Sequence, residues 1–533
     1  MPSVAIKEHH VVVIGAGIGG LVTALLLATK GVKVTLIEKN AVPGGKMRQV
    51  NGVDSGPTVF TMRWILDQVF AAAGTTLEAR LNLAKLDVLA RHAWQPKLGE
   101  RAATLDLFGD KKQSSDAIAQ FSSPSEARRF DAFCVQAAKV YRTLEAPYIR
   151  SERPSFFGIT RDLGPSGLAT LASLGPFASF WRLLGKRFGD PRLQQLFGRY
   201  ATYCGASPWS APATLMLIAD VEMQGVWSVE GGMTTVARVV ADLAQERGVE
   251  FIYNAAVDEI IVENGKAAGV RIANNGATNV IRSDSVVFNG DASAIADGLL
   301  GAAASTAVPK QPTHKRSLSA ITYSINAPTS GFNLAQHNVF FTNNYREEFR
   351  DVFEKNRIPR AGTVYVCAQD RPFSNLNDGG KERLLLLVNA PAVGDLPGGQ
   401  TAFSQKEIDQ CSQTHFKLLK ACGLEINLSD AQIDITTPIQ FNQHFPATGG
   451  ALYGQASHGW MNQFSRMGAV SRMPGLYLAG GSVHPGPGVP MAAMSGQLAA
   501  ETLMAHLDST KKLHRVVIAG GMSMPSVTAA SSV

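Results

Sequence analysis

The stretch from His10 to Glu38 constrains the fold of this chain more than any other part of the sequence. It begins with the apolar run HVVVI, continues through the glycine cluster GAGIGG into a segment of helical periodicity, and ends with the second apolar run VKVTLIE. Strand, glycine turn, helix, strand and terminal acid, in this order, predict a dinucleotide-binding βαβ unit. The clustered glycines and the acid after the second strand exclude the alternative of a signal peptide.

Three glycines and one acid of this unit are candidate cofactor-binding residues. Gly15 permits the tight turn, Gly17 lets the backbone approach a pyrophosphate, and Gly20 lets the helix pack closely on the strand. Glu38 is placed to accept hydrogen bonds from the ribose hydroxyls. The free N–H groups and the dipole at the helix N-terminus would attract the phosphates.

A glycine-rich segment follows this unit directly. Gly44 and Gly45 permit a second close approach of the backbone to the cofactor, and Lys46 and Arg48 add positive charge beside the phosphates. The turn at residues 54–57 then leads into a short predicted helix. An ordinary surface loop is the alternative, but the position after the nucleotide unit favours a loop that faces the cofactor.

Length and composition limit the remaining possibilities. A chain of 533 residues predicts two or three interleaved domains. The chain is 45% hydrophobic and 17% charged, and its net charge of +7 suits binding to an anionic membrane surface. The sequence has no basic cluster with interleaved aromatics, the pattern that would have indicated nucleic-acid binding. The five cysteines form no CxxC pair, which predicts a reduced, cytosolic interior without a metal site or a disulfide framework.

The region from about residue 75 to 225 has a helical pattern. Within it, residues 167–181 carry no charge, and Arg182, Lys186 and Arg187 follow. An apolar, tryptophan-bearing segment with a basic flank is typical of a helix in a membrane interface. A helical hairpin buried in a substrate domain is an equally supported alternative.

The sequence returns to the nucleotide-binding pattern after residue 225. A glycine pair and a predicted helix precede four β-type runs, and Asn264–Gly265 joins two of these as a tight hairpin. This order predicts a parallel strand, a β-meander and a returning parallel strand. The runs are residues 249–253, 256–262, 267–272 and 286–288.

Four motifs resemble the bacterial phytoene desaturase family of carotenoid-modifying flavoproteins: GAGIGGL with Glu38, PGGK, the DSGPT turn, and HPGPGVP with the small-residue helix after it. The resemblance extends over essentially the whole chain apart from the C-terminal tail. Residues 56–64 and the segment GGSVHPGPGVPMAAMSG are similar to the 1-hydroxycarotenoid 3,4-desaturase branch, because phytoene desaturases more often begin the helix after the threonine with an acid and a proline.

The resemblance implies FAD as cofactor and an α/β fold. This fold has a Rossmann-type FAD-binding domain (parallel sheet plus β-meander), an interleaved substrate domain and a helical membrane-associating part. It implies further cofactor contacts at Gly56, Val257, Gly480 and Val489. Lys46 stands where many relatives have arginine, so its phosphate contact would be a point charge rather than a bidentate fork.

The implied domain division has six parts. They are residues 1–90, 225–300 and 441–510 (FAD-binding), 91–224 (helical), 301–440 (substrate-domain sheet) and 511–533 (flexible tail).

The implied substrate is an acyclic C40 carotenoid that bears a terminal tertiary hydroxyl and is oxidised at its C3–C4 bond. Oxygen or a quinone would be the final electron acceptor, and the enzyme would be cytoplasmic and peripherally associated with the membrane that holds the substrate. One alternative is a phytoene desaturase or another carotene desaturase or isomerase of the family. Another is a carotenoid carrier without redox turnover.

Desaturation removes a hydride and a proton from adjacent carbons, and the flavin would accept the hydride in a dry, apolar tunnel. The sequence shows no Ser/His/Asp set, metal-ligand spacing or paired carboxylates. His484 is the one polar side chain in the predicted flavin-facing loop, with a catalytic role or a structural hydrogen bond as its two interpretations. Trp64 would either select the substrate end or pack its helix onto the nucleotide-binding domain.

Overall fold

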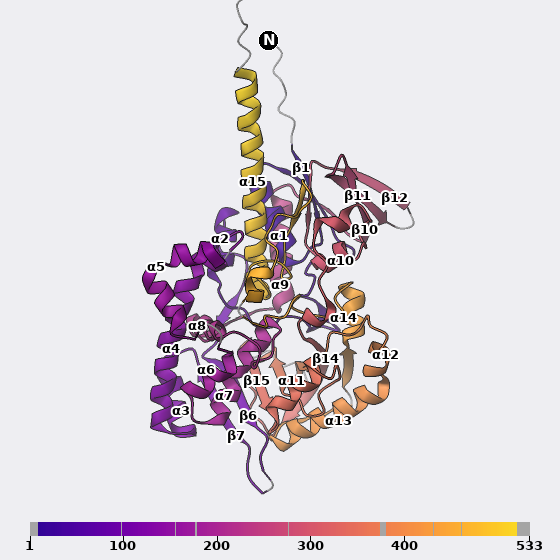
Figure 1. Ribbon diagram of the computed structural model, residues 1–533. Helices are drawn as coiled ribbons and strands as arrows, with labels where there is room; N and C mark the ends of the chain where they lie inside the picture. Colours follow the sequence, from indigo (N-terminus) through magenta and orange to yellow (C-terminus); the bar gives the residue numbers. More distant parts are fainter. Residues whose placement is uncertain are drawn as a thin grey trace, which may run out of the picture.

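The computed structural model describes residues 9–519, except residues 98, 155, 176–177, 275–276, 374–379, 430 and 460. A parallel sheet, a small meander and the long helix α15 (Val489–Ala519) lie at one end of the molecule. A larger sheet lies at the other end, and the helices of residues 111–224 run along one side (Figure 1).

The nucleotide-binding half contains a five-stranded sheet in which every neighbouring pair is parallel, in the order β20-β13-β1-β2-β9. Three distant parts of the sequence contribute these strands, so their carboxyl ends meet at one edge of the sheet, where doubly wound folds bind ligands. The predicted parallel sheet is confirmed. The strands are β1 (His10–Ile14), β2 (Lys33–Ile37), β9 (Glu250–Ile252), β13 (Ser285–Phe288) and β20 (Leu476–Leu478).

Four helices pack around this sheet in one hydrophobic cluster: α1 (Ile18–Thr29), α2 (Trp64–Ala72), α9 (Met233–Glu246) and α15. Helix α1 is buried over most of its surface, which explains why it is apolar nearly all round. A Cβ atom at Gly496 on α15 would overlap the backbone of Gly19, and Thr23 donates to the Gly496 carbonyl at 3.0 Å. Small residues therefore bring α1 and α15 into backbone contact.

The predicted meander is confirmed as an antiparallel three-stranded sheet of β10 (Ala255–Glu263), β11 (Lys266–Asn274) and β12 (Ala277–Arg282). Asn264 and Gly265 have φ angles of 51° and 75°, the left-handed pair that a two-residue hairpin of this twist requires.

The large sheet has β14 at its branch point and β7 at one edge. Strands β14, β17, β16 and β15 are antiparallel, whereas β15 pairs in parallel with β6. Most of its strands lie within residues 301–440, where the sequence predicted a sheet. Its strands are β6 (Val88–Trp94), β7 (Ala103–Phe108), β14 (Ser319–Ser330), β15 (His337–Phe341), β16 (Val364–Ala368), β17 (Lys381–Ala390), β18 (Glu425–Ile426) and β19 (Gln432–Thr436).

The helical interpretation of residues 75–225 is wrong for its first part. Strands β6 and β7 form a hairpin within it and extend the large sheet. Strand β7 alternates exposed Thr104 with buried Leu105 and Leu107, a local signal for a strand. The other partner of β6 is β15, which is more than 200 residues away in the sequence. The place of the hairpin in the large sheet therefore depends on a contact that local periodicity does not report.

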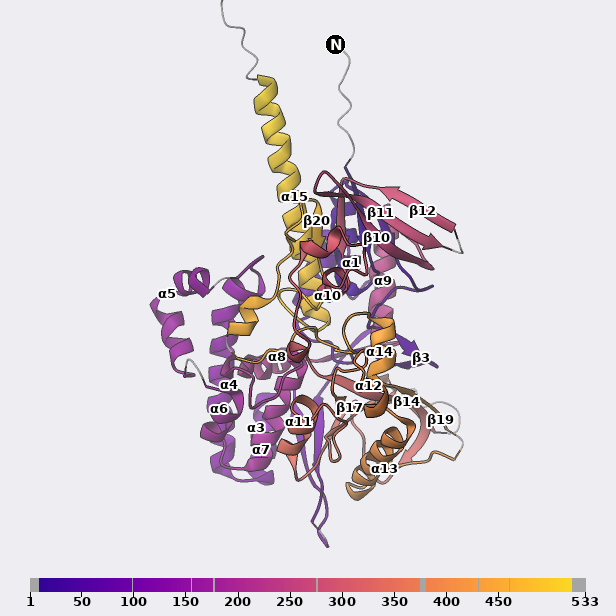
Figure 2. The same cartoon turned by 45° about the vertical axis from the view of Figure 1, so that its right-hand side comes forward.

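Helices occupy the rest of this region. They are α3 (Lys111–Phe121), α4 (Pro124–Leu144), η1 (Glu145–Ile149), α5 (Phe156–Ala172), α6 (Phe180–Arg187), α7 (Pro191–Gly198), η2 (Arg199–Cys204), η3 (Ala213–Met216) and α8 (Leu217–Gln224). Their apolar side chains pack on one face of the large sheet, which we call the inner face, through Val339, Phe341, Tyr365, Cys367 and Leu385. The opposite face packs on α13 (Gln405–Ala421), as the rotated view shows (Figure 2).

The shorter elements connect these parts. They are β3 (Gln49–Val50), β4 (Val53–Asp54), β5 (Leu83–Lys85), β8 (Trp227–Val229), α10 (Ala292–Ala296), α11 (Tyr345–Phe353), α12 (Gly399–Ala402) and α14 (Pro438–His444).

Helix α15 extends to Ala519, so the flexible tail expected from residue 511 begins inside a helix. No glycine or proline interrupts the sequence between Gly496 and Gly520, so no helix breaker stands at that boundary. Within the described ranges, no helix has the length and apolar character needed to cross a bilayer.

Candidate functional site

The glycine turn after β1 brings backbone groups to the carboxyl edge of the parallel sheet. Gly15 has φ 96°, a left-handed conformation that a side chain would strain, and Gly17 is the residue before α1. A Cβ atom at Gly20 would overlap the Gly15 carbonyl oxygen, so this glycine determines how closely α1 packs on β1. The first N–H groups of α1 lie at this edge and can bind phosphate.

Asn289, the residue after β13, contacts both the glycine turn after β1 and the loop that follows β20. Its side-chain nitrogen donates to the carbonyls of Gly15 at 3.1 Å and Gly17 at 3.2 Å. A Cβ atom at Gly17 would lie 2.9 Å from that nitrogen, and one at Gly480 would lie 2.8 Å from the side-chain oxygen. Sequence reasoning did not identify Asn289, although an Asn-Gly-Asp turn after a buried strand is a usable signal.

The Glu38 carboxylate is 5% exposed and already accepts hydrogen bonds from the protein. One oxygen accepts from the Ala16 N–H at 2.7 Å, and the other accepts from the backbone and side chain of Asn40 at 2.9 and 2.8 Å. The Glu38 carbonyl accepts from Ala255 N–H at 3.0 Å, which brings the start of β10, and Val257 on it, beside Glu38. The ribose contact of Glu38 and the cofactor contact of Val257 remain predictions.

Lys46, Gly45 and Gly56 form a second backbone layer over the glycine turn. A Cβ atom at Gly45 would lie 3.1 Å from the Gly17 Cα, and one at Gly56 would overlap the Lys46 carbonyl oxygen. The Lys46 ammonium donates to the Leu452 carbonyl, so in this structure it contacts protein rather than open space. A side chain at position 56 would therefore clash with the backbone, which explains the glycine without a ligand. The contact of Gly56 with the cofactor remains a prediction.

Arg466 is a second buried cation near the turn, and sequence reasoning did not identify it. The guanidinium, on a residue 9% exposed, donates to the carbonyls of Tyr453, Gln455, Gly481 and Ser482. No described carboxylate makes an ion pair with it, and burial lowers the pKa of Arg466.

Lys46 and Arg466 are close enough to repel each other, and the nearby Asp291 is the main opposing charge. Burial also lowers the pKa of Lys46. Two buried cations with one acid leave an excess of positive charge beside glycine-lined backbone. This arrangement suits a pyrophosphate, and the residues present therefore fit a dinucleotide.

The C-terminal loop runs from β20 to α15 and carries the remaining predicted residues. Gly480 has φ 110°, and its N–H donates to Ser495 at 3.2 Å, while Val489 begins α15 and is 5% exposed. His484 lies 2.9 Å through its Nε2 from the Tyr148 carbonyl, and burial lowers its pKa to about 4. The imidazole is therefore neutral and holds the loop against the helical segments.

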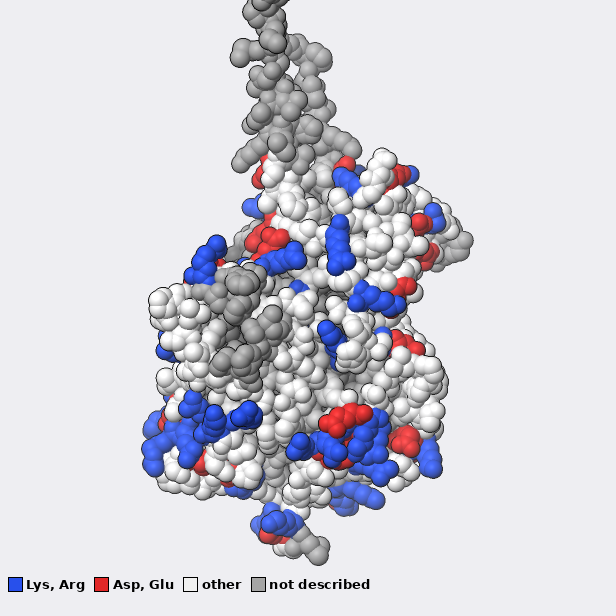
Figure 3. Space-filling view, viewed as in Figure 1, with Lys and Arg blue, Asp and Glu red and all other residues white. Residues whose placement is uncertain are grey.

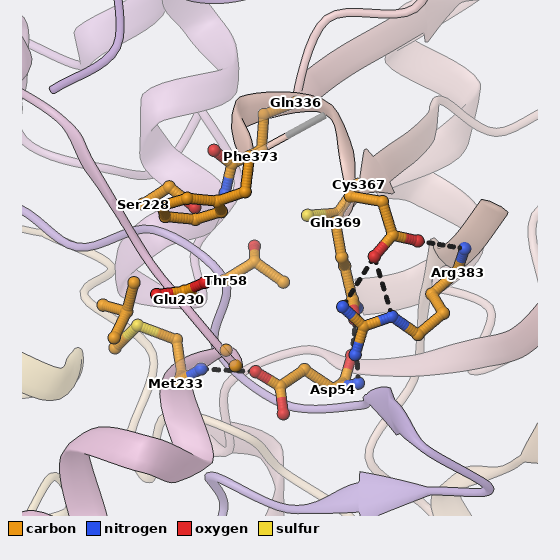
Figure 4. Close-up of a pocket in the computed structure, with 14 residues that line it drawn as sticks. Asp54, Thr58, Ser228, Glu230, Met233, Gln336, Cys367, Gln369, Phe373 and Arg383 are labelled. Carbon is orange, nitrogen blue, oxygen red and sulfur yellow. Dashed lines mark hydrogen bonds and ion pairs between the residues drawn. The ribbon is translucent and has the colours of Figure 1, made fainter. Parts of the chain in front are cut away.

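A pocket opens where the nucleotide-binding half meets the large sheet (Figure 4). Asp54 forms part of its floor; its carboxylate accepts from Met233 N–H and, at 3.0 Å, from the Thr234 hydroxyl, so it caps α9. Burial raises the pKa of Asp54. Thr58, the last residue of the DSGPT motif, also lines this pocket, and we call it the Thr58 pocket.

Trp64, at the start of α2, packs between the nucleotide-binding half and the helical segments. Its indole N–H donates to the Tyr141 hydroxyl at 3.3 Å, and the Arg150 guanidinium lies 3.9 Å from its ring centroid. These contacts favour the packing interpretation of Trp64.

The comparisons with known proteins agree with this geometry. Residues 18–504 match the family model of flavin-containing amine oxidoreductases, and the chain belongs to this family. FAD is therefore confirmed as the cofactor that the sequence predicted.

The sequence also resembles individual members. It is 56% identical over 527 residues, 98% of each chain, to a hydroxyneurosporene desaturase of Rubrivivax gelatinosus. It is 40% identical to a hydroxyneurosporene desaturase of Cereibacter sphaeroides, over 94% of this chain and 99% of the other.

Two solved structures share the fold. One is an oxidoreductase from Methanosarcina mazei, with a TM-score of 0.59 and 17% identity, covering 92% of this chain and 100% of that one. The other is a putrescine oxidase, with a TM-score of 0.55 and 16% identity, covering 93% and 99%.

Proposed function

We propose that this protein is an FAD-dependent desaturase that introduces the C3–C4 double bond into 1-hydroxylated acyclic carotenoids. The observation that carries the proposal is the 56% identity to a hydroxyneurosporene desaturase over 98% of both chains. The buried cations and glycine-lined backbone of the site support the cofactor part of the proposal.

FAD supplies the hydride acceptor for this oxidation. The chain supplies binding and orientation: the α1 N-terminus, Lys46 and Arg466 neutralise the pyrophosphate, and Glu38 accepts hydrogen bonds from the ribose. His484 is a poor acid because it is neutral and its Nε2 proton is directed at the Tyr148 carbonyl. Its role in this scheme is to position the C-terminal loop.

In our proposal, apolar walls from the inner face of the large sheet and from the helices on it would bound the site of the polyene. Val339, Phe341 and Leu385 on the sheet are buried together with Phe130 and Phe197 on the helices. Such walls exclude water from the reacting bond and limit the conformations of the chain.

The membrane contact in our proposal involves the helical segments. Trp181 stacks on Trp209 at 4.4 Å between ring centroids, so it belongs to the protein interior. Leu168 on α5 is 41% exposed and Arg182 and Lys186 on α6 are exposed. Lys and Arg side chains also gather over the lower part of the helical side (Figure 3). We therefore propose peripheral binding to anionic lipid, with oxygen or a membrane quinone as the final electron acceptor.

The test is to incubate the protein with FAD and membranes and to supply phytoene, neurosporene and 1-hydroxyneurosporene separately. We expect a red-shifted product spectrum, from one added conjugated double bond, with 1-hydroxyneurosporene. Ready conversion of phytoene without reaction of the hydroxylated substrate would replace the proposal with a phytoene desaturase. Anaerobic substrate should also bleach the flavin absorbance, which a non-enzymatic carrier would leave unchanged.

A further inference from the structure

The inner face of the large sheet carries a buried polar cluster that has no role in the proposed binding of FAD or of the polyene. Strands β15 and β16 pair with His337 opposite Cys367 and Val339 opposite Tyr365. All four side chains therefore lie on the same face, among the apolar side chains of the helical segments. Polar side chains on such a face need partners, because burial without a hydrogen bond is unfavourable.

Tyr365 is the centre of this cluster. Its hydroxyl lies 2.7 Å from the Thr58 hydroxyl and 2.7 Å from the Nδ1 of His337. Thr58 comes from the nucleotide-binding half, so the phenol joins the inner face to the segment predicted to face the flavin.

Two buried polar atoms in this region lack hydrogen-bond partners, and one cation lies over the Tyr365 ring. His337 is 3% exposed, and its Nε2 has no hydrogen-bond partner. Gln336 is 8% exposed and lines the Thr58 pocket, and its side-chain oxygen has no partner (Figure 4). Arg199 is 9% exposed, lies 5.4 Å from the Tyr365 ring centroid and makes no ion pair with any described carboxylate.

The cluster suits a hydroxyl better than a charged or an apolar ligand. Burial lowers the pKa of His337 to about 4, so the ring is neutral and carries one proton. If Nδ1 holds the proton, Nε2 accepts a hydrogen bond; if Nε2 holds it, Nε2 donates. A hydroxyl satisfies either tautomer because it both donates and accepts. Arg199 would disfavour a second cation.

The reaction chemistry also favours a hydroxyl partner near the flavin. In a 1-hydroxylated carotenoid the oxidised C3 is two bonds from the carbon that bears the hydroxyl. The hydroxyl therefore lies close to the flavin while C3–C4 is oxidised. Thr58 belongs to the segment predicted to face the flavin, and Tyr365 bonds to it directly.

We propose that His337, Tyr365, Gln336 and Arg199 form a subsite that recognises the terminal tertiary hydroxyl of the carotenoid and selects it over the unhydroxylated chain. This inference rests on the proposed function and adds the residues that read the substrate end. We call these residues the hydroxyl subsite.

The primary test compares kcat/KM for 1-hydroxyneurosporene and neurosporene in the FAD-loaded protein. The variants are Tyr365→Phe, which keeps the ring beneath Arg199, and His337→Asn, whose amide replaces Nδ1 but leaves the Nε2 position empty. We expect the hydroxylated-to-plain ratio to fall about tenfold in each, the usual range for loss of one hydrogen bond to a substrate hydroxyl. His337→Gln, whose amide reaches the Nε2 position, should retain more of the preference than His337→Asn.

Tyr323→Phe is the matched control. Tyr323 is a buried tyrosine of the same sheet on the opposite face, where its hydroxyl bonds Ser412 at 3.0 Å. It should leave the ratio unchanged. Flavin absorbance and melting temperature check that each variant is folded and loaded.

The outcomes distinguish failure of the subsite from failure of the proposed function. A wild-type protein that does not oxidise 1-hydroxyneurosporene overturns the proposed function. A wild-type protein that prefers the hydroxylated chain, with folded Tyr365→Phe and His337→Asn variants that keep the preference, overturns the hydroxyl subsite alone.

Discussion

The nucleotide-binding half and the inner face of the large sheet differ in how the hydrogen-bonding capacity of their polar side chains is satisfied. In the first, Glu38 bonds to Ala16 and Asn40 in neighbouring turns, and Asn289 bonds to the glycine turn. On the inner face, Tyr365 meets Thr58, His337 and Arg199, which come from segments that are far apart in the sequence. The first region is a backbone scaffold that needs little side-chain help, whereas the second is a side-chain environment with bonding capacity left for a ligand.

The first prediction tests whether the scaffold depends on backbone contact. Gly20→Val should abolish accumulation of flavin-loaded protein, because its Cβ would overlap the Gly15 carbonyl oxygen. Purification yield and flavin absorbance measure the effect. Gly185→Ala is the control: Gly185 also lies in a helix, but an added methyl group there would meet no atom within 4 Å, so the change should be neutral or stabilising by up to about 1 kcal/mol. Normal flavin loading of Gly20→Val would remove the distinction between the two regions.

The second prediction concerns Glu38, a buried side chain of the scaffold. Glu38→Arg should weaken FAD binding about a hundredfold, because it removes the acceptor of Ala16 N–H and places a cation where the ribose binds. Titration of the apoprotein by flavin fluorescence gives the Kd. Glu501→Arg, an exposed acid on α15, should retain the wild-type Kd. Unchanged affinity in Glu38→Arg would contradict the predicted role of Glu38.

The third prediction concerns His92, a buried histidine on strand β6 of the large sheet. Burial lowers the pKa of His92 from 6.5 to about 4, and His92 is 5% exposed. Below pH 6.5, His92 binds a proton in the unfolded state but stays neutral in the folded state. The free energy of unfolding is therefore highest above pH 6.5 and falls as the pH drops toward 4. Between pH 7 and 5 this loss should be about 2 kcal/mol.

Urea unfolding at both pH values measures that loss. His92→Asn keeps a donor for the Leu105 carbonyl, which lies 3.2 Å from Nδ1, and should lose about 2 kcal/mol less than wild type between pH 7 and 5. The exposed His314→Asn should behave as wild type. Equal losses in wild type and His92→Asn would show that this buried ring titrates normally.

The smallest expected effect concerns the outer surface of the helical side. Reversing the charge of Arg182, Lys186 and Arg187 to Glu should weaken binding to anionic liposomes, by about 1 kcal/mol per charge that lies near the lipid. Flotation at low and high salt measures it, and added salt should weaken the wild type as well.

A matched triple reversal separates this site from net charge. Lys406, Lys417 and Lys420 are exposed on α13, on the other side of the large sheet. Their reversal to Glu should leave flotation closer to wild type. Equal effects of both triple variants would attribute the binding to total charge and remove the proposed membrane face.

The local elements of the fold were predictable because their signals are contiguous. The βαβ unit, the Asn264–Gly265 hairpin and the β20 to α15 segment depend on residues within one short stretch, where glycine conformation and apolar periodicity act directly. Strands β6 and β7 were missed although β7 carries a local strand signal, whereas the place of β6 in the large sheet depends on its distant partner β15. Residues 167–181 left a membrane-interface helix and a buried hairpin as open alternatives, because Trp209, the stacking partner of Trp181, lies in another segment.

The sequence by itself determined the nucleotide-binding unit, because backbone approach demands glycine at fixed positions and leaves a contiguous pattern. The motifs of the sequence also carried the family resemblance, and that resemblance implied FAD. Only the tertiary structure decided that Asn289 supports the glycine turn, that Arg466 joins Lys46 as a buried cation, and that Tyr365 meets Thr58 and His337. These roles arise from side chains that different strands and loops bring together. No local periodicity encodes such a meeting, since it depends on how the two sheets and the helical segments pack.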